Sequence, residues 1–199
     1  MDKRLIVGAR EGTFKAGSQY KKGLILSVLR TSTEVSGTCS EDVKIAEDNP
    51  LYGGLLKQSN GTLQYFNNRY IDVKYSNTGA IDMLNLSDKI TAVDFGLIDG
   101  KSLVIGVKMS SWHDKSMTKH NALVLYTVQN SVRCTGIMTV PVYIEDGNAL
   151  YDTLMTECDG DISYFVNSYI SVDNNSKGYL ESVKVLESIA KPIDFKLVA

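Results

Sequence analysis

The chain has 199 residues, 43% of them hydrophobic, and a formal net charge of −2. It is therefore long enough to bury one shared core or two modest ones, and its charge gives no overall attraction to nucleic acid or to anionic membranes. No run approaches the roughly 18 apolar residues of a membrane-spanning helix, and no signal-peptide core follows the first residues. These features predict a soluble, cytoplasmic protein without a membrane partner.

The first predicted elements are strands. Residues 4–10 and 23–31 are short, apolar and rich in branched side chains, which is typical of strands. Residues 42–47 alternate as a third strand, with Val43 and Ile45 facing inward. The segment between the first two strands is rich in lysine, and we expect a basic loop there.

A short helix is predicted after the third strand. Asn49 is suited to cap its first turn, and Pro50 is suited to its first helical position. Gly53 and Gly54 lower the helical propensity, so we expect few turns.

The stretch 61–73 predicts a β-hairpin. A three-residue loop at 67–69 separates an apolar face from a polar one, whereas a two-residue loop mixes the two faces. This hairpin pairs Phe66 with Tyr70 on the polar face and places Asn68 in the left-handed conformation. We expect the rings to line a contact surface for bases; alternatively they pack on the sister domain or another chain, or only stabilise the hairpin.

A turn at residues 76–79 leads into two more predicted strands, 81–86 and 90–95. The corresponding part of the second half of the chain, residues 178–190, is also compatible with a helix, because its apolar residues do not alternate cleanly.

This whole pattern occurs twice. A shift of 99 residues aligns residues 23–90 with 122–189 at 19 identical positions of 68. Shifts of 98 and 100 extend the match to the two ends, so that Val93-Asp94-Phe95 corresponds to Ile193-Asp194-Phe195. Because this period is the size of a small domain, the sequence predicts two domains of one fold, residues 1–99 and 100–199.

The order of elements predicts a mainly β fold. We expect two tandem copies of a small OB-like β-barrel, each with a short helix, because β-sandwiches usually lack such a helix. The three cysteines, Cys39, Cys134 and Cys158, have no counterpart in the other copy. A disulfide framework would be duplicated with its domain, so reduced thiols are predicted.

Two stretches carry a family resemblance. Residues 70–81, Tyr-Ile-Asp-Val-Lys-Tyr-Ser-Asn-Thr-Gly-Ala-Ile, resemble the closing hairpin of the small single-stranded-DNA-binding proteins of phages and plasmids, the gene V type of OB fold. The basic opening, residues 3–14, is similar to the same family. The resemblance implies an OB fold and a single-stranded DNA partner. Members of that family usually carry one domain and pair as dimers, so two fused copies resemble a built-in dimer.

Both copies are basic in the same place. Residues 1–30 hold seven Lys and Arg against two acidic residues, and residues 100–129 hold four against one. This part of the surface is either an ordinary solvated loop or a surface that faces a polyanion. The candidate nucleic-acid-binding residues are Phe14, Lys15, Lys21, Lys22, Phe66 and Tyr70 in the first copy, and Trp112, Lys115, Lys119, Phe165 and Tyr169 in the second.

No known catalytic signature is present, so we predict a protein that is not an enzyme and needs no cofactor. His113, Asp114 and His120 are candidates for a metal site. The first copy has lysines at the two histidine positions, however, which favours an ordinary polar loop, and we predict no metal. Asp94 and its counterpart Asp194 are explained more simply as acceptors of backbone hydrogen bonds than as an acid and base pair.

Three functions remain open. The first is non-enzymatic binding of single-stranded DNA or RNA, which the basic segments and paired aromatic residues favour. The second is a structural or assembly role, as a viral or mobile-element component that interacts through β-edges and aromatic faces; the weak overall charge favours it. The third is an enzyme of unrecognised type. A homo-oligomer is a possible partner arrangement.

Overall fold

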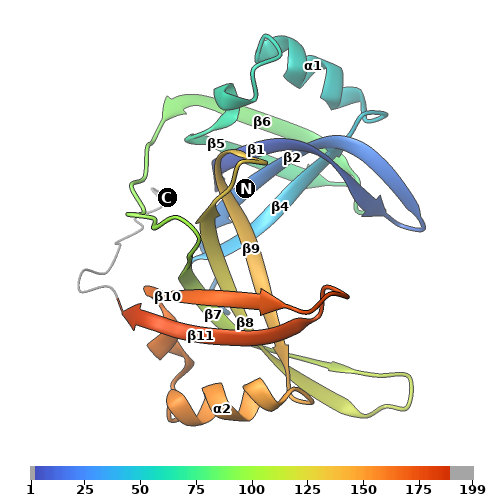
Figure 1. Ribbon diagram of the computed structural model, residues 1–199. Helices are drawn as coiled ribbons and strands as arrows, with labels where there is room; N and C mark the ends of the chain where they lie inside the picture. The colour runs from blue at the N-terminus through green and yellow to red at the C-terminus, as the bar shows by residue number, and fades with distance from the viewer. Residues whose placement is uncertain (1–2, 189–199) are drawn as a thin grey trace.

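A computed structural model describes residues 3–188 of the chain. It confirms the mainly β fold with two short helices (Figure 1). The described strands form one antiparallel sheet of 11 strands, whose main path runs β11-β10-β7-β8-β9-β1-β2-β4. Strands β5 and β6 branch from β1, and β3 pairs with β7.

Corresponding elements follow in the same order in the two halves. The first half contains β1 (Lys3–Ala16), β2 (Gln19–Arg30), β3 (Ser36–Gly37), β4 (Cys39–Ala46), α1 (Pro50–Gln58), the 3-10 turn η1 (Leu63–Phe66), β5 (Arg69–Tyr75) and β6 (Ile81–Ile90). The second half contains β7 (Ser102–His113), β8 (Lys119–Asn130), β9 (Thr135–Glu145), α2 (Ala149–Glu157), η2 (Ile162–Phe165), β10 (Ser168–Asn174) and β11 (Leu180–Ser188).

Strand pairing is also the same in the two halves. In the first half β1 pairs with β2 and β5, β2 pairs with β4, and β5 pairs with β6. In the second half β7, β8, β9, β10 and β11 repeat these pairings. Within residues 3–188 no ladder joins β4 to β6 or β9 to β11, so the sheet is open. The expectation of closed barrels is corrected accordingly.

The predicted basic loops are paired strands instead. β1 and β2 continue their ladder to the tight turn at Gly17, so that Phe14 lies opposite Lys21. β7 and β8 form a matching hairpin in which Trp112 lies opposite His120. We call these long hairpins the first and second arms. Figure 1 shows that both arms extend toward the same side of the molecule, with α1 and α2 at opposite ends.

The predicted hairpin at residues 61–73 is wrong. The chain forms the turn η1, and only β5 is a strand in this stretch. The turn buries the whole Phe66 side chain in the core of the first half, a burial that alternation along a strand cannot reveal. Asn68 is left-handed as predicted, with φ 64, but it stands at the entry to β5, where its N–H donates to the Ile6 carbonyl over 2.7 Å.

Other expectations have mixed outcomes. The short helix and its Asn49 cap are confirmed, since the Asn49 side chain accepts the Leu51 N–H over 2.9 Å. The predicted strands 81–86 and 90–95 are replaced by the single strand β6, which ends at Ile90. Residues 180–188 form a strand and not a helix. The repeat match at 193–197 lies outside the described residues.

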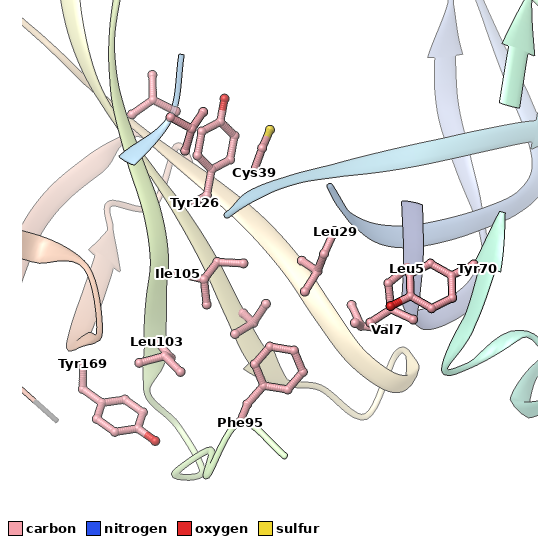
Figure 2. Close-up of a cluster of buried hydrophobic side chains, with 13 residues drawn as sticks. Leu5, Val7, Leu29, Cys39, Tyr70, Phe95, Leu103, Ile105, Tyr126 and Tyr169 are labelled. Carbon is pink, nitrogen blue, oxygen red and sulfur yellow. The ribbon is translucent and has the colours of Figure 1, made fainter. Parts of the chain in front are cut away.

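The buried apolar side chains form three clusters, of which one joins the halves. The first core lies within the first half and contains Leu26, Ile45 and Phe66, and the second core contains the corresponding residues of the second half, such as Phe165. The third, which we call the central core, takes residues from both halves, and Figure 2 shows it. Its members are Leu5, Val7, Leu29, Val35, Cys39, Tyr70, Phe95, Leu103, Ile105, Val124, Tyr126, Val128 and Tyr169.

The halves also exchange short strand pairings beside the central core. Gly37 of β3 pairs with Gly106 of β7, and Gly136 of β9 pairs with Gly8 of β1. Because Gly8 corresponds to Gly106 and Gly37 to Gly136 in the repeat, the two contacts are reciprocal, as across a twofold axis. A Cβ atom at Gly8 would collide with the Ile137 carbonyl, so only glycine permits this approach.

Candidate nucleic-acid interface

Alternation along the strands gives each half an outer face. In β4, Ile45 is buried in the first core, whereas Asp42 and Lys44 face the other side of the sheet. The register between β1 and β2 places Phe14 and Lys21 on that same side. We call this side the outer face of the first half.

A groove of about 580 Å³ lies on this outer face, and we call it the first groove. It runs between the first arm, the outer residues of β4, the start of α1 and the turn between β5 and β6. Its lining residues are Phe14, Lys15, Ala16, Gly17, Lys21, Asp42, Lys44, Ala46, Asp48, Asn49, Pro50, Tyr75, Gly79, Ala80 and Ile81.

The first groove combines an aromatic ring with lysines. Phe14 is only 8% exposed, and the Lys44 ammonium lies 6.0 Å from the centre of its ring. Lys21 Nζ lies 2.6 Å from Asp48 Oδ2, so that cation is already paired. Lys15 and Lys44 form no ion pair with a carboxylate of the described residues. These two cations are the ones available to an anionic ligand.

A second depression, the central groove, adjoins the first groove because both are lined by Asp42 and Lys44. It measures about 340 Å³ and lies between β4 of the first half and β8 and β9 of the second. Its other lining residues are Arg30, Cys39, Ser40, Glu41, Tyr126, Thr139, Pro141 and Tyr143. Burial raises the pKa of the Cys39 thiol and of the Tyr126 hydroxyl, so both groups are neutral at pH 7.

Asp42 is held in place by both halves. Its carboxylate accepts Arg10 Nη2 over 2.7 Å, and Arg10 Nη1 donates to Ser27 over 3.1 Å. Thr139 from β9 donates to the other carboxylate oxygen over 3.3 Å. The boundary between the two grooves is therefore braced across the junction of the halves.

The outer face of the second half has a different composition. Trp112 stacks on His120 with ring centres 5.6 Å apart and planes at 24°, and it is 38% exposed. Tyr143, at the repeat position of Lys44, is 57% exposed. Where the first half offers lysines, the second half offers open aromatic rings.

Hydrogen bonds fix the charge state of the second arm. The Ser116 hydroxyl, followed by the Thr118 N–H, lowers the pKa of Asp114 to about 2. Asp114 in turn raises the pKa of His120, whose Nε2 lies 3.3 Å from the Asp114 carboxylate. The Asn121 N–H lowers the pKa of Asp146, which lies 3.6 Å from His120 Nδ1.

The structure brings only some of the predicted site residues together. Phe14, Lys15 and Lys21 line the first groove. Trp112 lies on the outer face of the second half, and Lys115 is exposed in the turn at the tip of the second arm. The remaining predicted lysines of the arms lie on the opposite side from the ring beside them: Lys22 pairs with Thr13, and Lys119 pairs with His113.

Four predicted aromatic residues are not on a surface. Phe66 and Phe165 are fully buried in the cores of their own halves. Tyr70 and Tyr169 are 8% and 6% exposed and belong to the central core. The expectation that these rings line a contact surface is therefore wrong, and for the two tyrosines the alternative of packing between the halves holds. The cause is η1 and η2, which replace the hairpins from which exposure was inferred.

Sequence reasoning missed three residues of the candidate interface. Lys44, Tyr75 and Tyr143 were not among the candidates, although Tyr75 lines the first groove. A signal for Lys44 was present, because the predicted inward direction of Val43 and Ile45 already turns Lys44 outward. The repeat then identifies Tyr143 as its counterpart. Tyr75 carried no such signal, because its position depends on the β5–β6 turn folding back toward β4.

In the described part of the chain, no three His, Cys, Asp or Glu side chains gather closely enough to hold a metal ion. Cys39, Cys134 and Cys158 are free and buried. None of the helices within residues 3–188 has the length and apolar character needed to cross a bilayer.

Comparison of the chain with protein families, curated proteins and solved structures finds no match. The resemblance to gene V type proteins, the cytoplasmic location and the absence of an enzymatic activity therefore stay predictions.

Proposed function

We propose that the protein binds single-stranded nucleic acid along the outer faces of its two halves. One observation carries this proposal: the first groove lies between the first arm, the outer face of β2 and β4, and the turn between β5 and β6. OB folds bind oligonucleotides on the face of their second and third strands, between the loop joining strands 1 and 2 and the loop joining strands 4 and 5. In the first half these parts are β2 and β4, the tip of the first arm, and the β5–β6 turn.

The strand pairing supports an OB-like assignment for each half. In an OB fold the first strand pairs with the second and the fourth, the fifth pairs with the fourth, and a helix often separates the third from the fourth. Each half has these pairings and this helix, and lacks only the ladder between the third and fifth strands within the described residues. OB barrels are themselves partly open, so an open sheet is compatible with the assignment.

The side chains support a ligand that has both charge and flat apolar surface. Lys15 and Lys44 are available for phosphates, while Trp112 and Tyr143 present open rings on which bases stack. Because the central groove joins the outer faces through Lys44 and Tyr143, one strand contacts both halves in this proposal.

Charge reversal on the two sides of the sheet of the first half tests the phosphate contacts. The variants Lys44→Glu and Lys22→Glu make the same change of charge, but only Lys44 faces the grooves. Binding of a fluorescent oligothymidylate is followed by anisotropy at several salt concentrations. We expect Lys44→Glu to weaken binding and to lower the slope of log K against log salt by about 0.7 for each phosphate that is no longer neutralised, with little effect of Lys22→Glu. Equal effects of the two variants would remove the outer face from the mechanism.

The aromatic contacts are tested separately. Trp112 is the only tryptophan, so its fluorescence reports directly on a base that stacks there. Trp112→Ala and Tyr143→Ala are each expected to weaken binding by about 1–3 kcal/mol per stacked base without sequence preference. Unchanged fluorescence on titration with oligonucleotide would show that bases do not reach the second arm.

An assembly role is the second candidate, because the outer edges of β4 and β6 carry no ladder within residues 3–188. Free edges are templates for pairing with another chain. Sedimentation at rising protein concentration distinguishes the two functions, since the nucleic-acid proposal requires no growth of particle size.

A further inference from the structure

The segment that joins the halves packs against the central core on the side of Tyr169. Phe95 is 2% exposed within that core, and Val93 and Leu97 lie against it, partly buried. The Tyr169 hydroxyl donates a hydrogen bond to the carbonyl of Gly96. Figure 2 shows Phe95, Leu103 and Tyr169 within this cluster.

The matching position in the first half lacks such a partner. Tyr70 corresponds to Tyr169 in the repeat and is also buried, but its hydroxyl has no hydrogen-bond partner among the described residues. Nearby, Asp72 Oδ1 is buried without a partner as well. Buried polar atoms are nearly always hydrogen-bonded, so two of them close together on β5 indicate a missing neighbour.

Both residues line a groove of about 280 Å³, which has room for an aromatic side chain. Lys3 and Lys89 line it too, and Ile71 and Leu86 beside them pack their side chains in the first core. An extended peptide that carries an aromatic residue and a carboxylate suits this groove. Its backbone supplies a carbonyl for Tyr70 and an N–H for Asp72, and its carboxylate is attracted by the lysines.

We propose that the groove beside Tyr70 is the docking site of residues 193–197 of the same chain. Ile193-Asp194-Phe195-Lys196-Leu197 repeats Val93-Asp94-Phe95-Gly96-Leu97 at a shift of 100 residues. By the reciprocal relation of the halves, Phe195 enters the groove and the Lys196 carbonyl accepts the Tyr70 hydroxyl. The two segments begin at a similar distance along the chain from the preceding strand. Residue 93 follows the end of β6 at Ile90 by three residues, and residue 193 follows the end of β11 at Ser188 by five.

A double-mutant cycle in the full chain tests this docking. Phe195→Asp and Tyr70→Phe are made singly and together, and the midpoint of unfolding is measured. We expect each single variant to lower the midpoint and the double variant to lower it by less than the sum, because both changes remove one contact. Phe195→Asp combined with Tyr169→Phe is the matched control, for which additive effects are expected. An additive cycle with Tyr70→Phe would overturn the proposal.

Lys196 supplies a further test. Gly96 has φ 58, a conformation that costs energy for lysine, so Lys196→Gly is expected to raise the midpoint if residue 196 adopts the geometry of residue 96. Hydrogen exchange should show protection at residues 193–197 that Phe195→Asp abolishes. Exchange at the rate of an unstructured peptide in the unmodified protein would overturn the proposal. So would a midpoint that rises with protein concentration together with dimers in sedimentation, because the segment would then dock on a second copy.

Discussion

Gly106 occupies the point at which a strand of one half touches a strand of the other. A Cβ atom there would collide with the Thr38 carbonyl, which belongs to the backbone and has no rotamer by which to move away. Gly54 in α1 is the opposite case, because a Cβ atom there meets nothing within 4 Å. Replacing glycine by alanine is therefore expected to change the free energy of unfolding in opposite directions at the two positions.

We expect Gly106→Ala to lower the free energy of unfolding by about 1–3 kcal/mol, the usual range for overpacking, or more if the pairing of β3 with β7 is broken. Gly54→Ala is expected to raise it by about 0.5–1 kcal/mol, because alanine is the better helix former. Denaturant titrations of both variants measure these changes. A neutral Gly106→Ala would mean that the halves do not approach each other this closely.

The second arm contains a histidine whose pKa is raised by its neighbours. The hydrogen bond with Asp114 raises the pKa of His120 above its ordinary value near 6.5. A raised histidine pKa means that the folded protein binds the proton more tightly than the unfolded chain does. The stabilisation by this contact is therefore complete below about pH 6.5 and is lost as the pH rises through the raised value.

We expect the His120 ring signals in an NMR titration to have a midpoint above about 6.5 and to fall back toward it in Asp114→Asn. Asp159→Asn, which removes an exposed carboxylate outside the arm, is the control and should leave the midpoint in place. An unchanged midpoint in Asp114→Asn would assign the shift to Asp146 or to the stacked Trp112.

Sequence reasoning succeeded for residues whose role depends on near neighbours. The left-handed Asn68 and the inward Val43 were predicted because a local backbone conformation and a two-residue period decide them. It failed for Phe66 and Tyr70, because their burial depends on which element of the other parts of the chain covers them. An aromatic residue next to polar ones looks exposed until the turn that redirects it is known.

The two helices carry the same cap in different surroundings. Asn49 accepts the Leu51 N–H, and its Nδ2 also donates to the Ile81 carbonyl over 3.0 Å, which fastens α1 to the start of β6. Asn148 accepts the Leu150 N–H over 3.0 Å and has no corresponding bond to β11 within residues 3–188. The start of α1 is therefore fixed against β6 and lines the first groove, whereas the Asn148 side chain only caps α2.

We expect Asn148→Ala to cost about 1 kcal/mol of unfolding free energy, as for an ordinary N-cap. Asn49→Ala should cost about 1 kcal/mol more, because it also removes the hydrogen bond to β6. Asn49→Asp keeps the cap but not the donor, so it should cost about 1 kcal/mol, which is less than Asn49→Ala. Equal costs for the two alanine variants would show that the bond to Ile81 adds nothing.

At the level of elements, the first three strands and the helix of the first half could be predicted from the sequence, since alternation and capping are local. The strand before residue 67 and the strand 90–95 were wrong. Strand ends were less accurate: the arms were expected as loops because lysine and glycine in residues 12–23 lower strand propensity, whereas the β1–β2 ladder overrides it. η1 was missed because four residues are too few to show a helical period.

The halves share the central core, and we therefore expect them to unfold together. Leu26 is fully buried in the first core, and Trp112 lies in the second half. Leu26→Ala should cost about 2–5 kcal/mol and should move the transition seen by Trp112 fluorescence together with the transition seen by circular dichroism. The exposed change Glu181→Ala is the control for the second half. If Leu26→Ala leaves the midpoint seen by Trp112 fluorescence unchanged, the halves unfold as two independent domains.

At the scale of the molecule, the duplication predicted two copies of one fold but not how they join. The sequence repeat is the same whether the two copies form separate domains or two halves that exchange strands. What decides between them is the meeting of Gly8 with Gly136 and of Gly37 with Gly106, a contact between positions far apart in sequence. Glycines in an alignment do not reveal which glycine they face.

Fusion of the halves has a consequence for any elongated ligand. Two identical subunits about a twofold axis repeat each side chain, so a strand laid across them meets the same groups when it is turned end for end. Here the two halves differ at equivalent positions of the repeat. Lys44 in the first half corresponds to Tyr143 in the second, and Lys21 corresponds to His120. If the proposed nucleic-acid strand spans both outer faces, we expect it to bind in one preferred direction, with its phosphates favoured on the first half and its bases on the second.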